Sequence, residues 1–254
     1  MLWAVLFIVF PLLIVVYYAF VDAEGNFSFE NILGLSDYAD IFLLSVELAV
    51  IATVICLLIG YPLAYIMAKC SPGKQKFLIM LLMLPMWTNL LIRTYSIMAI
   101  LDDGGFLNTI LQTELHIVGT KGAVVFGMGY DFLPYMVLPI YTCISKIDKN
   151  MWEAASDLGC SPFRVIWNVI LPLSTSGVVS GVTMVLVPSI STFYISQKMG
   201  SAGTTLIGDV IESQFKAAYN PNLGAALSLV LMVMVLVCIA VMNRFSDEEE
   251  VATI

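Results

Sequence analysis

Long apolar runs separated by short polar stretches are the main pattern along this chain of 254 residues. A helix that crosses a bilayer needs about 20 consecutive, mostly apolar residues. Six runs meet this length and predict six transmembrane helices: Met1–Val21, Leu48–Ala68, Phe77–Leu101, Gly122–Ser145, a span within Val165–Gln197, and Asn222–Asn243. The pattern therefore predicts an all-α membrane protein that forms a single transmembrane domain over residues 1–254.

The composition agrees with a chain that lies mostly in lipid. Apolar residues make up 60% of it and charged residues 12%, whereas soluble domains average about 25% charged residues. The mean hydropathy is +0.94. A net charge of −8 without a basic stripe argues against a nucleic-acid partner. Five cysteines without CxxC spacing and a single histidine predict neither disulfides nor a metal site.

The first apolar run differs from a secretory signal peptide. No basic segment precedes Met1–Val21, its apolar stretch is too long, and no small-x-small cleavage site follows it. We expect this run to remain in the membrane as the first span.

The distribution of lysine and arginine predicts the orientation, because cytoplasmic loops are enriched in these residues. With a cytoplasmic N-terminus, the inner segments hold seven cations: Lys69, Lys74, Lys76, Lys146, Lys149, Arg164 and Arg244. The outer segments then hold three: Lys121, Lys198 and Lys216. Both termini are therefore expected in the cytoplasm, and the acidic first loop outside, facing either a soluble partner or water.

The connection between predicted spans four and five carries several helix-capping signals. Lys149–Leu158 predicts a short helix, and Gly159 lies where a helix end favours the left-handed conformation. Ser161 then fits the N-cap of a second helix, with Pro162 as its first residue. The connection is therefore expected to form two short helices on the inner side that lead into the fifth span.

The same connection resembles the EAA loop of binding-protein-dependent ABC importer permeases. The segment Glu153-Ala154-Ala155-Ser156-Asp157-Leu158-Gly159 is followed, after twelve residues, by Pro172. Val169 stands where the family commonly has isoleucine. The resemblance implies a type I ABC importer permease fold with a cytoplasmic docking loop over residues 146–172 that inserts into a separate ATPase subunit. It assigns coupling to Glu153, Ala154, Ala155, Asp157, Gly159, Arg164 and Pro172.

No phosphate-binding loop is visible in the sequence. Gly73-Lys74 is followed by Gln75 and lacks the upstream glycine of the G-x-x-x-x-G-K-[ST] pattern. The resemblance therefore implies a transport subunit that is not an enzyme and holds no cofactor, with ATP and Mg bound by partner ATPase chains.

A wider set of segments is similar to the spermidine/putrescine permeases, the PotB-like family. The matching segments are Leu84–Tyr95, Leu133–Pro139, Leu206–Ile211, Gln214-Phe215 and Gly224-Ala225-Ala226. This resemblance covers Tyr61 to Ser228 and implies polyamine import across the plasma (inner) membrane of a bacterium. It also implies a second homologous permease (PotC-like), a pair of ATPase subunits (PotA-like) and an extracytoplasmic binding protein (PotD-like).

Transport of a polycation favours carboxylates and aromatic faces along its path. Ionisable residues inside spans are functional candidates by default, and Asp131 lies near the middle of the fourth span. The candidate substrate-pathway residues are Trp87, Asn89, Tyr95, Asp131, Tyr135 and Tyr194. A buried ion pair or a helix–helix hydrogen bond is an equal alternative for Asp131. For Trp87 and the tyrosines, the alternative is anchoring at the lipid interface.

The sequence does not decide which group Arg93 pairs with or which helix packs against the glycines of the fifth span. Arg93 fits poorly in the path of a cation, so it either reaches the outer interface or pairs with Asp131, or with Asp102 and Asp103. Ser176-Gly177 and Ser180-Gly181 form a small-xxx-small face, which favours close packing against a helix of this or the partner permease.

Three other functions are weaker alternatives. A secondary transporter typically shows inverted repeats and more spans, and an intramembrane enzyme needs a denser set of reactive side chains. An ABC permease for sulfate, phosphate, iron or thiamine shares the loop and differs only in the solute.

Overall fold

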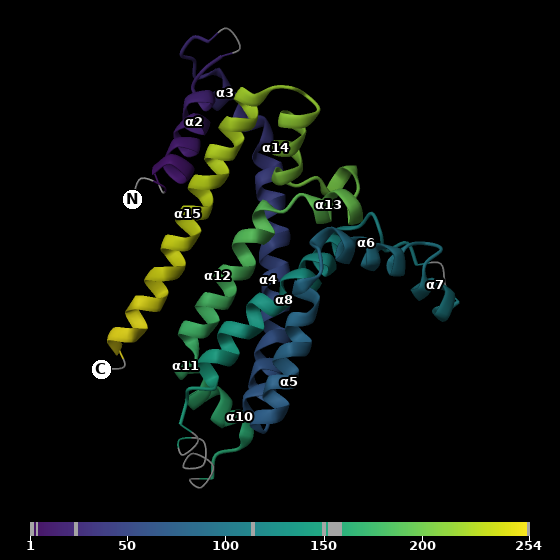
Figure 1. Cartoon of the computed structure of the whole chain (residues 1–254), viewed down its shortest axis with the longest axis vertical. Coiled ribbons are helices and arrows are strands. Elements are labelled where there is room, and N and C mark those ends of the chain that lie inside the picture. The colour runs from purple at the N-terminus through teal and green to yellow at the C-terminus, as the bar shows by residue number, and fades with distance from the viewer. Residues whose placement is uncertain are drawn as a thin grey trace. The chain divides into compact units, whose positions relative to one another are not determined.

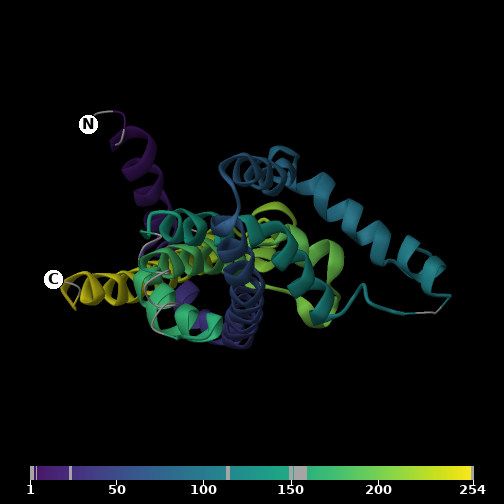
Figure 2. The same ribbon diagram turned by 90° about the horizontal axis from the view of Figure 1, so that it is seen from below.

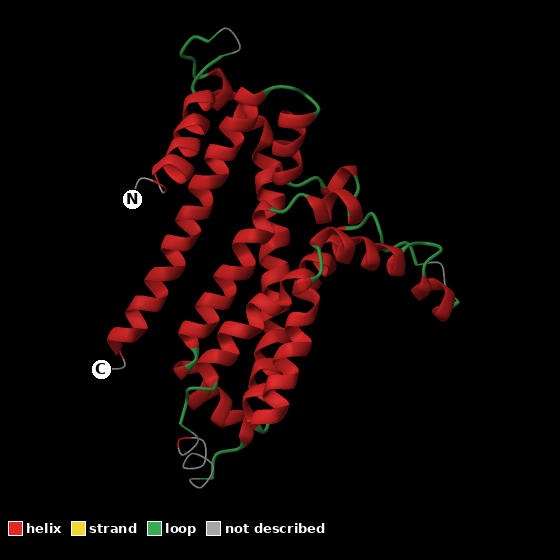
Figure 3. Cartoon of the chain, viewed as in Figure 1, coloured by secondary structure: helices red, strands yellow, loops and turns green. Residues whose placement is uncertain are grey.

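The computed structural model describes residues 3, 5–22, 25–112, 115–148, 151 and 159–252. This part of the chain is helical (Figure 3). Its one β-type pairing is an isolated bridge between Val21 and Phe27. Figure 1 labels the α-helices. Their bounds are α2 Phe10–Ala19, α3 Glu30–Leu33, α4 Ala39–Lys69, α5 Pro72–Met83, α6 Leu90–Leu101, α7 Phe106–Leu111, α8 Lys121–Ile144, α10 Pro162–Val165, α11 Leu171–Leu173, α12 Thr175–Ser191, α13 Tyr194–Met199, α14 Ile207–Lys216 and α15 Pro221–Ala252.

Shorter segments of other helical types connect or extend these helices. Val5–Val9 and Ile166–Ile170 are π-helical, whereas Gly34–Tyr38, Leu84–Trp87 and Ala202–Thr204 are 3₁₀ helices. Helices satisfy their backbone hydrogen bonds internally, which a chain surrounded by lipid requires.

Two compact units make up the chain, each assembled from three stretches of sequence. Unit 1 contains Met1–Ala49, Met98–Val124 and Ile190–Val237. Unit 2 contains Val50–Ile97, Val125–Ser189 and Cys238–Ile254. The prediction of a single domain and of a docking loop over residues 146–172 stays a prediction.

Three helical segments in the described part of the chain are long and apolar enough to cross a membrane: Asn31–Lys69, Lys121–Ile144 and Pro221–Arg244. Two bent helix pairs raise this number to five if each pair forms one span. Val5–Ala19 is apolar but shorter. The predicted second and sixth spans lie within such segments, the predicted fourth span ends one residue beyond Ile144, and the total of six spans stays a prediction.

In unit 1, small residues join α2 to the beginning of α15. Ala19 is fully buried and forms a cluster with Ala225 and Ala226. Lipid gives helices no hydrophobic reason to associate, so close packing through small side chains contributes much of the attraction.

A second cluster in unit 1 fixes the amphipathic helix α14. Ile207 and Val210 of α14 pack with Leu227 of α15 and with partly buried residues at the beginning of α4. The backbone N–H of Ile207 donates a hydrogen bond of 2.8 Å to Oγ of Ser45. The first turn of α14 is therefore held by α4 and α15.

Asp209 joins α14 to α13 inside unit 1. Its Oδ2 accepts a hydrogen bond of 2.7 Å from the N–H of Leu206, and its Oδ1 accepts one of 3.0 Å from the hydroxyl of Ser196. Burial raises the pKa of this carboxyl to about 6, although both hydrogen bonds act in the opposite direction. The helix lies outside the candidate spans.

Replacing Asp209 with asparagine is expected to remove a loss of stability between pH about 4 and about 6. The folded pKa of about 6 lies above the ordinary value of 3.8, so in this range the folded protein keeps a proton that the unfolded chain releases. Wild-type stability relative to the variant should therefore fall as the pH rises, by up to about 3 kcal/mol at about 1.4 kcal/mol per pKa unit. Melting temperatures in detergent at pH 4.5 and 7 test this, and a pH-independent difference between the two proteins contradicts it.

In unit 2, α12 packs directly on α8 through glycines. A Cβ added at Gly177 would lie 2.7 Å from Cβ of Cys143, and one at Gly181 would lie 2.9 Å from Sδ of Met136. These contacts confirm the predicted close packing of the small-residue face and place its partner helix within this subunit.

The third predicted span consists of two helices joined by a break. The 3₁₀ helix Leu84–Trp87 follows α5, Thr88 is extended (φ −86°, ψ 155°), and α6 begins at Leu90. Pro85 lacks a backbone donor, and Oδ1 of Asn89 accepts a hydrogen bond of 2.8 Å from the N–H of Leu91, which starts a new helix. Pro72–Trp87 and Leu90–Leu111 are bent by 94°, and the turn between α5 and α6 is visible in Figures 1 and 2.

Candidate substrate pathway and coupling segment

Arg93 of α6 and Asp131 of α8 form a buried ion pair in unit 2. Nε of Arg93 lies 3.3 Å from Oδ1 of Asp131, and the two side chains are only 9% and 1% exposed. Thr94 adds a hydrogen bond of 3.3 Å from its hydroxyl to Oδ2 of Asp131. Of the three partners that the sequence left open for Arg93, the structure selects Asp131.

The pair is incompletely hydrogen-bonded. Nε and Nη1 of Arg93 and Oδ1 of Asp131 are buried and have no well-directed hydrogen-bond partner within the described residues. The single proton of the Thr94 hydroxyl is shared with the carbonyl of Leu90 in its own helix, which lies at the shorter distance of 3.0 Å. Native proteins pair most buried polar atoms, so three unsatisfied atoms in one cluster call for a functional explanation.

The other predicted pathway residues of unit 2 lie on either side of this pair. Trp87 is 73% exposed at the break before α6, and Asn89 caps that helix. Tyr95 is 46% exposed on α6. Tyr135 is 37% exposed, one helical turn after Asp131 on α8, and its ring centroid is 6.4 Å from that of Phe132.

Tyr194 belongs to unit 1, where it begins α13 and is half-buried. The structure brings Arg93 and Asp131 into contact, whereas Trp87, Tyr95 and Tyr135 present exposed rings. The roles of these residues in a substrate pathway stay predictions.

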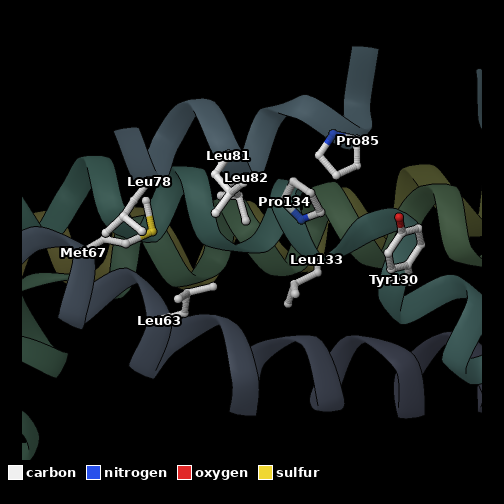
Figure 4. Close-up of a pocket in the computed structure, with 9 residues that line it drawn as sticks. All are labelled: Leu63, Met67, Leu78, Leu81, Leu82, Pro85, Tyr130, Leu133 and Pro134. Atoms are coloured by element: carbon white, nitrogen blue, oxygen red, sulfur yellow. The ribbon is translucent and has the colours of Figure 1, made fainter. Parts of the chain in front are cut away.

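An apolar cavity of about 230 Å³ lies in unit 2 beside Tyr130 (Figure 4). Its lining comes from α4, α5, the following 3₁₀ helix and α8: Leu63, Met67, Leu78, Leu81, Leu82, Pro85, Tyr130, Leu133 and Pro134. A larger groove of about 620 Å³ follows α4 from Leu57 to Ile66 and is also lined almost entirely by apolar groups. Neither surface offers a carboxylate to an ammonium group, so we assign neither to the substrate.

The end of the predicted docking loop has the local geometry that its residue types indicate. Gly159 has φ of +81°, the left-handed region that glycine tolerates. Pro162 begins α10, and the N–H of Arg164 donates to Oγ of Ser161 at 3.4 Å. The predicted turn and N-cap are thereby confirmed. Glu153, Ala154, Ala155 and Asp157 lie outside the described residues.

The segment continues from α10 into a second bent pair of helices. Pro172 lies in α11, and Ile166–Leu173 and Thr175–Ser191 are bent by 66°. At the bend, Oγ of Ser174 lies 3.0 Å from the hydroxyl of Tyr61 on α4. The described end of the docking loop, residues 159–172, is therefore joined to α12 at a bend that contacts α4. Its assigned contacts with an ATPase stay predictions.

Sequence reasoning missed two features of the site. The first is the hydrogen bond from Thr94 to Asp131, for which the sequence carries no signal, because it depends on how α6 packs on α8. The break before α6 had a readable signal, since Pro85 and the capping residue Asn89 lie four residues apart. The described residues contain no group of three or more His, Cys, Asp or Glu side chains that could hold a metal.

The described residues combine apolar helices of membrane-spanning length, two bent helix pairs and a buried ion pair, which are the features of a helical membrane protein. Residues 60–247 match the family described as binding-protein-dependent transport system inner membrane component. The chain belongs to this family and is a multi-pass component of the inner membrane.

Two curated relatives are similar along nearly the whole chain. PotB, a spermidine/putrescine transport system permease of Haemophilus influenzae, is 39% identical over 256 residues, which cover 95% of this chain and 90% of that protein. The PotB protein of Escherichia coli is 37% identical over 246 residues, which cover 91% and 90%. The predicted resemblance to PotB-like permeases is confirmed. Both relatives are named as transport components.

A solved structure supports the fold. The crystal structure of a bacterial ABC transporter that imports the acidic polysaccharide alginate superposes with a TM-score of 0.79 at 16% identity, covering 97% of this chain and 92% of that chain. At this identity the likeness concerns the fold alone. It confirms the predicted ABC importer permease fold.

Proposed function

We propose that the chain is the transmembrane permease subunit of an ATP-driven importer that moves polyamines such as spermidine and putrescine into the cell by alternating access. The observation that carries this proposal is the similarity to PotB permeases over more than nine tenths of the chain. A chain of this family serves transport, and ATP hydrolysis then belongs to separate ATPase subunits that hold ATP and Mg.

The buried carboxylate of Asp131 supports a cationic substrate. It lies on α8 with Tyr130, Phe132 and Tyr135 in its immediate sequence, and aromatic faces attract ammonium groups. A carboxylate buried to 1% exposure in a candidate span is costly and has a functional role by default.

The partners in this proposal are a second, homologous permease (PotC-like), a pair of ATPase subunits (PotA-like) and an extracytoplasmic binding protein (PotD-like). The family description supports a binding protein as one kind of partner. Both termini lie in the cytoplasm in this topology, as the lysine and arginine distribution favours.

A continuous physical path within unit 2 would couple ATP hydrolysis to the spans. The docking loop leads through Gly159 and α10 to the helix bend at Ser174, and from there into α12. Gly177 and Gly181 bring α12 against α8 at van der Waals distance, so a displacement of α12 moves the helix that carries Asp131.

ATP hydrolysis by the reconstituted importer in nanodiscs tests the proposed function. We expect hydrolysis to rise when the binding protein is loaded with spermidine or putrescine, and not with the unloaded protein. Stimulation by sulfate, phosphate, iron or thiamine, with no response to polyamines, contradicts the polyamine assignment and leaves the permease assignment intact.

A further inference from the structure

The ion pair between Arg93 and Asp131 combines deep burial with poor hydrogen bonding. Only the 3.3 Å approach of Nε to Oδ1 joins the two charged groups, and three of their polar atoms lack a directed partner in the described part of the chain. A structural ion pair in a low-dielectric interior stabilises a protein when its geometry is good and its remaining protons are satisfied. This pair meets neither condition.

A displaceable pair is expected to have these properties. If the guanidinium bonded well to the carboxylate, another cation could not replace it at moderate cost. An incompletely satisfied guanidinium still neutralises Asp131 and so keeps an unpaired charge from being buried. A substrate ammonium, with three N–H donors, can satisfy the carboxylate better than Arg93 does.

The helix that carries Arg93 is attached in a way that permits movement relative to α5. Thr88 has an extended backbone. The N–H of Leu91 donates to Oδ1 of Asn89 and the N–H of Arg93 donates to its carbonyl, so neither group bonds to α5. Few loop residues that change dihedral angle are enough to form a hinge between helices. The break at Thr88-Asn89 therefore lies where α6 can tilt and separate Arg93 from Asp131.

An aromatic residue lies one helical turn from Asp131 on the same helix. Tyr135 follows Asp131 by one turn, which places both on one face of α8, and its ring is 37% exposed. An ammonium that reached Tyr135 would be one helical turn from Asp131.

We propose that Arg93 is the resting counter-ion of Asp131, and that a primary ammonium group of the substrate replaces it on the carboxylate during transport. This inference rests on the proposed function, because it requires a cationic substrate. It gives Asp131 the role of a specificity-determining ligand and Arg93 the role of a positioning residue that closes the site when no substrate is present.

The two single variants should act in opposite directions. In Arg93→Gln the carboxylate no longer has a resident cation to displace, so binding of radiolabelled spermidine to the complete importer in nanodiscs without ATP should tighten by about tenfold. In Asp131→Asn the ligand is lost, so binding should weaken by at least about tenfold. The Michaelis constant for uptake by proteoliposomes should fall in the first variant and rise in the second.

The double variant Arg93→Gln/Asp131→Asn separates this role from a purely structural one. Its two neutral side chains leave no buried charge unpaired, so it should fold even if a single variant does not. If the pair serves only stability, both single variants are impaired alike and the double variant recovers uptake. If the carboxylate binds substrate, the double variant folds and still fails to bind spermidine.

Lys121→Gln is the matched control, because Lys121 forms an exposed ion pair with Glu47 at 3.9 Å. This variant should bind spermidine and take it up as the wild type does. Recovery of uptake in the double variant, or no gain of affinity in Arg93→Gln by either measurement, overturns the inference. A wild-type importer that does not respond to polyamines instead contradicts the proposed function.

Discussion

Replacing Gly159 with valine is expected to abolish polyamine uptake while the subunit still inserts into the membrane. Gly159 has φ of +81°, where a β-branched side chain is strongly disfavoured. No atom lies within 4 Å of a Cβ added there, so the effect comes from the backbone conformation and not from a clash. Because Gly159 connects the docking loop to α10, a changed turn redirects the loop away from the ATPase.

Uptake and ATP hydrolysis, both measured on the reconstituted complex, check this expectation. Uptake should fall by more than about tenfold, which corresponds to a free-energy cost of about 1.4 kcal/mol or more for the docking conformation of the turn. Gly159→Asn should lose less, since asparagine tolerates the left-handed region. Gly73→Ala is the control, because Gly73 is equally exposed with open space around it but has no positive φ. Normal uptake by the valine variant refutes the coupling role of this turn.

Replacing Gly181 with leucine is expected to prevent correct packing of unit 2. A Cβ at this position would lie 2.9 Å from Sδ and 3.0 Å from the carbonyl oxygen of Met136 on α8. The thioether can move, but the carbonyl belongs to the helix backbone, so α12 must separate from α8. Overpacking of this kind typically costs about 1–3 kcal/mol, and more where backbone atoms are involved.

The melting temperature and the size-exclusion profile of the purified subunit in detergent measure this loss. The control on the facing helix is Gly129→Ala, because a Cβ at Gly129 meets no atom within 4 Å. Alanine there should leave stability within about 1 kcal/mol of the wild type or raise it slightly. An unchanged melting temperature for the leucine variant means that α8 and α12 are not in close contact.

Much of the helical fold was readable from the chain, because apolar runs act over the length of a helix. Gly122–Ser145 and Asn222–Asn243 coincide closely with α8 and with the apolar part of α15. Pro85 indicated a kink inside Phe77–Leu101, but the full break into two helices was not predicted, since hydropathy does not register a capping asparagine within an apolar run. The resemblance to PotB-like permeases carried the functional class further than hydropathy alone.

The candidate site, like the fold, was only partly predictable from the sequence. The carboxylate at Asp131 was identified because a charge in a span is costly wherever it lies. The sequence could not show whether Arg93 pairs with Asp131 or with Asp102 and Asp103, because the partner depends on the direction that α6 takes after Thr88.

Features whose cause lies within one helical turn were decided by the order of residues alone. The left-handed turn at Gly159 and the cap at Ser161 and Pro162 follow from backbone dihedral preferences and local hydrogen bonds. The ion pair of Arg93 with Asp131 and the contact of Gly181 with Met136 join residues of different helices. Only the packing of those helices brings such residues together, because distance along the sequence does not specify which faces meet.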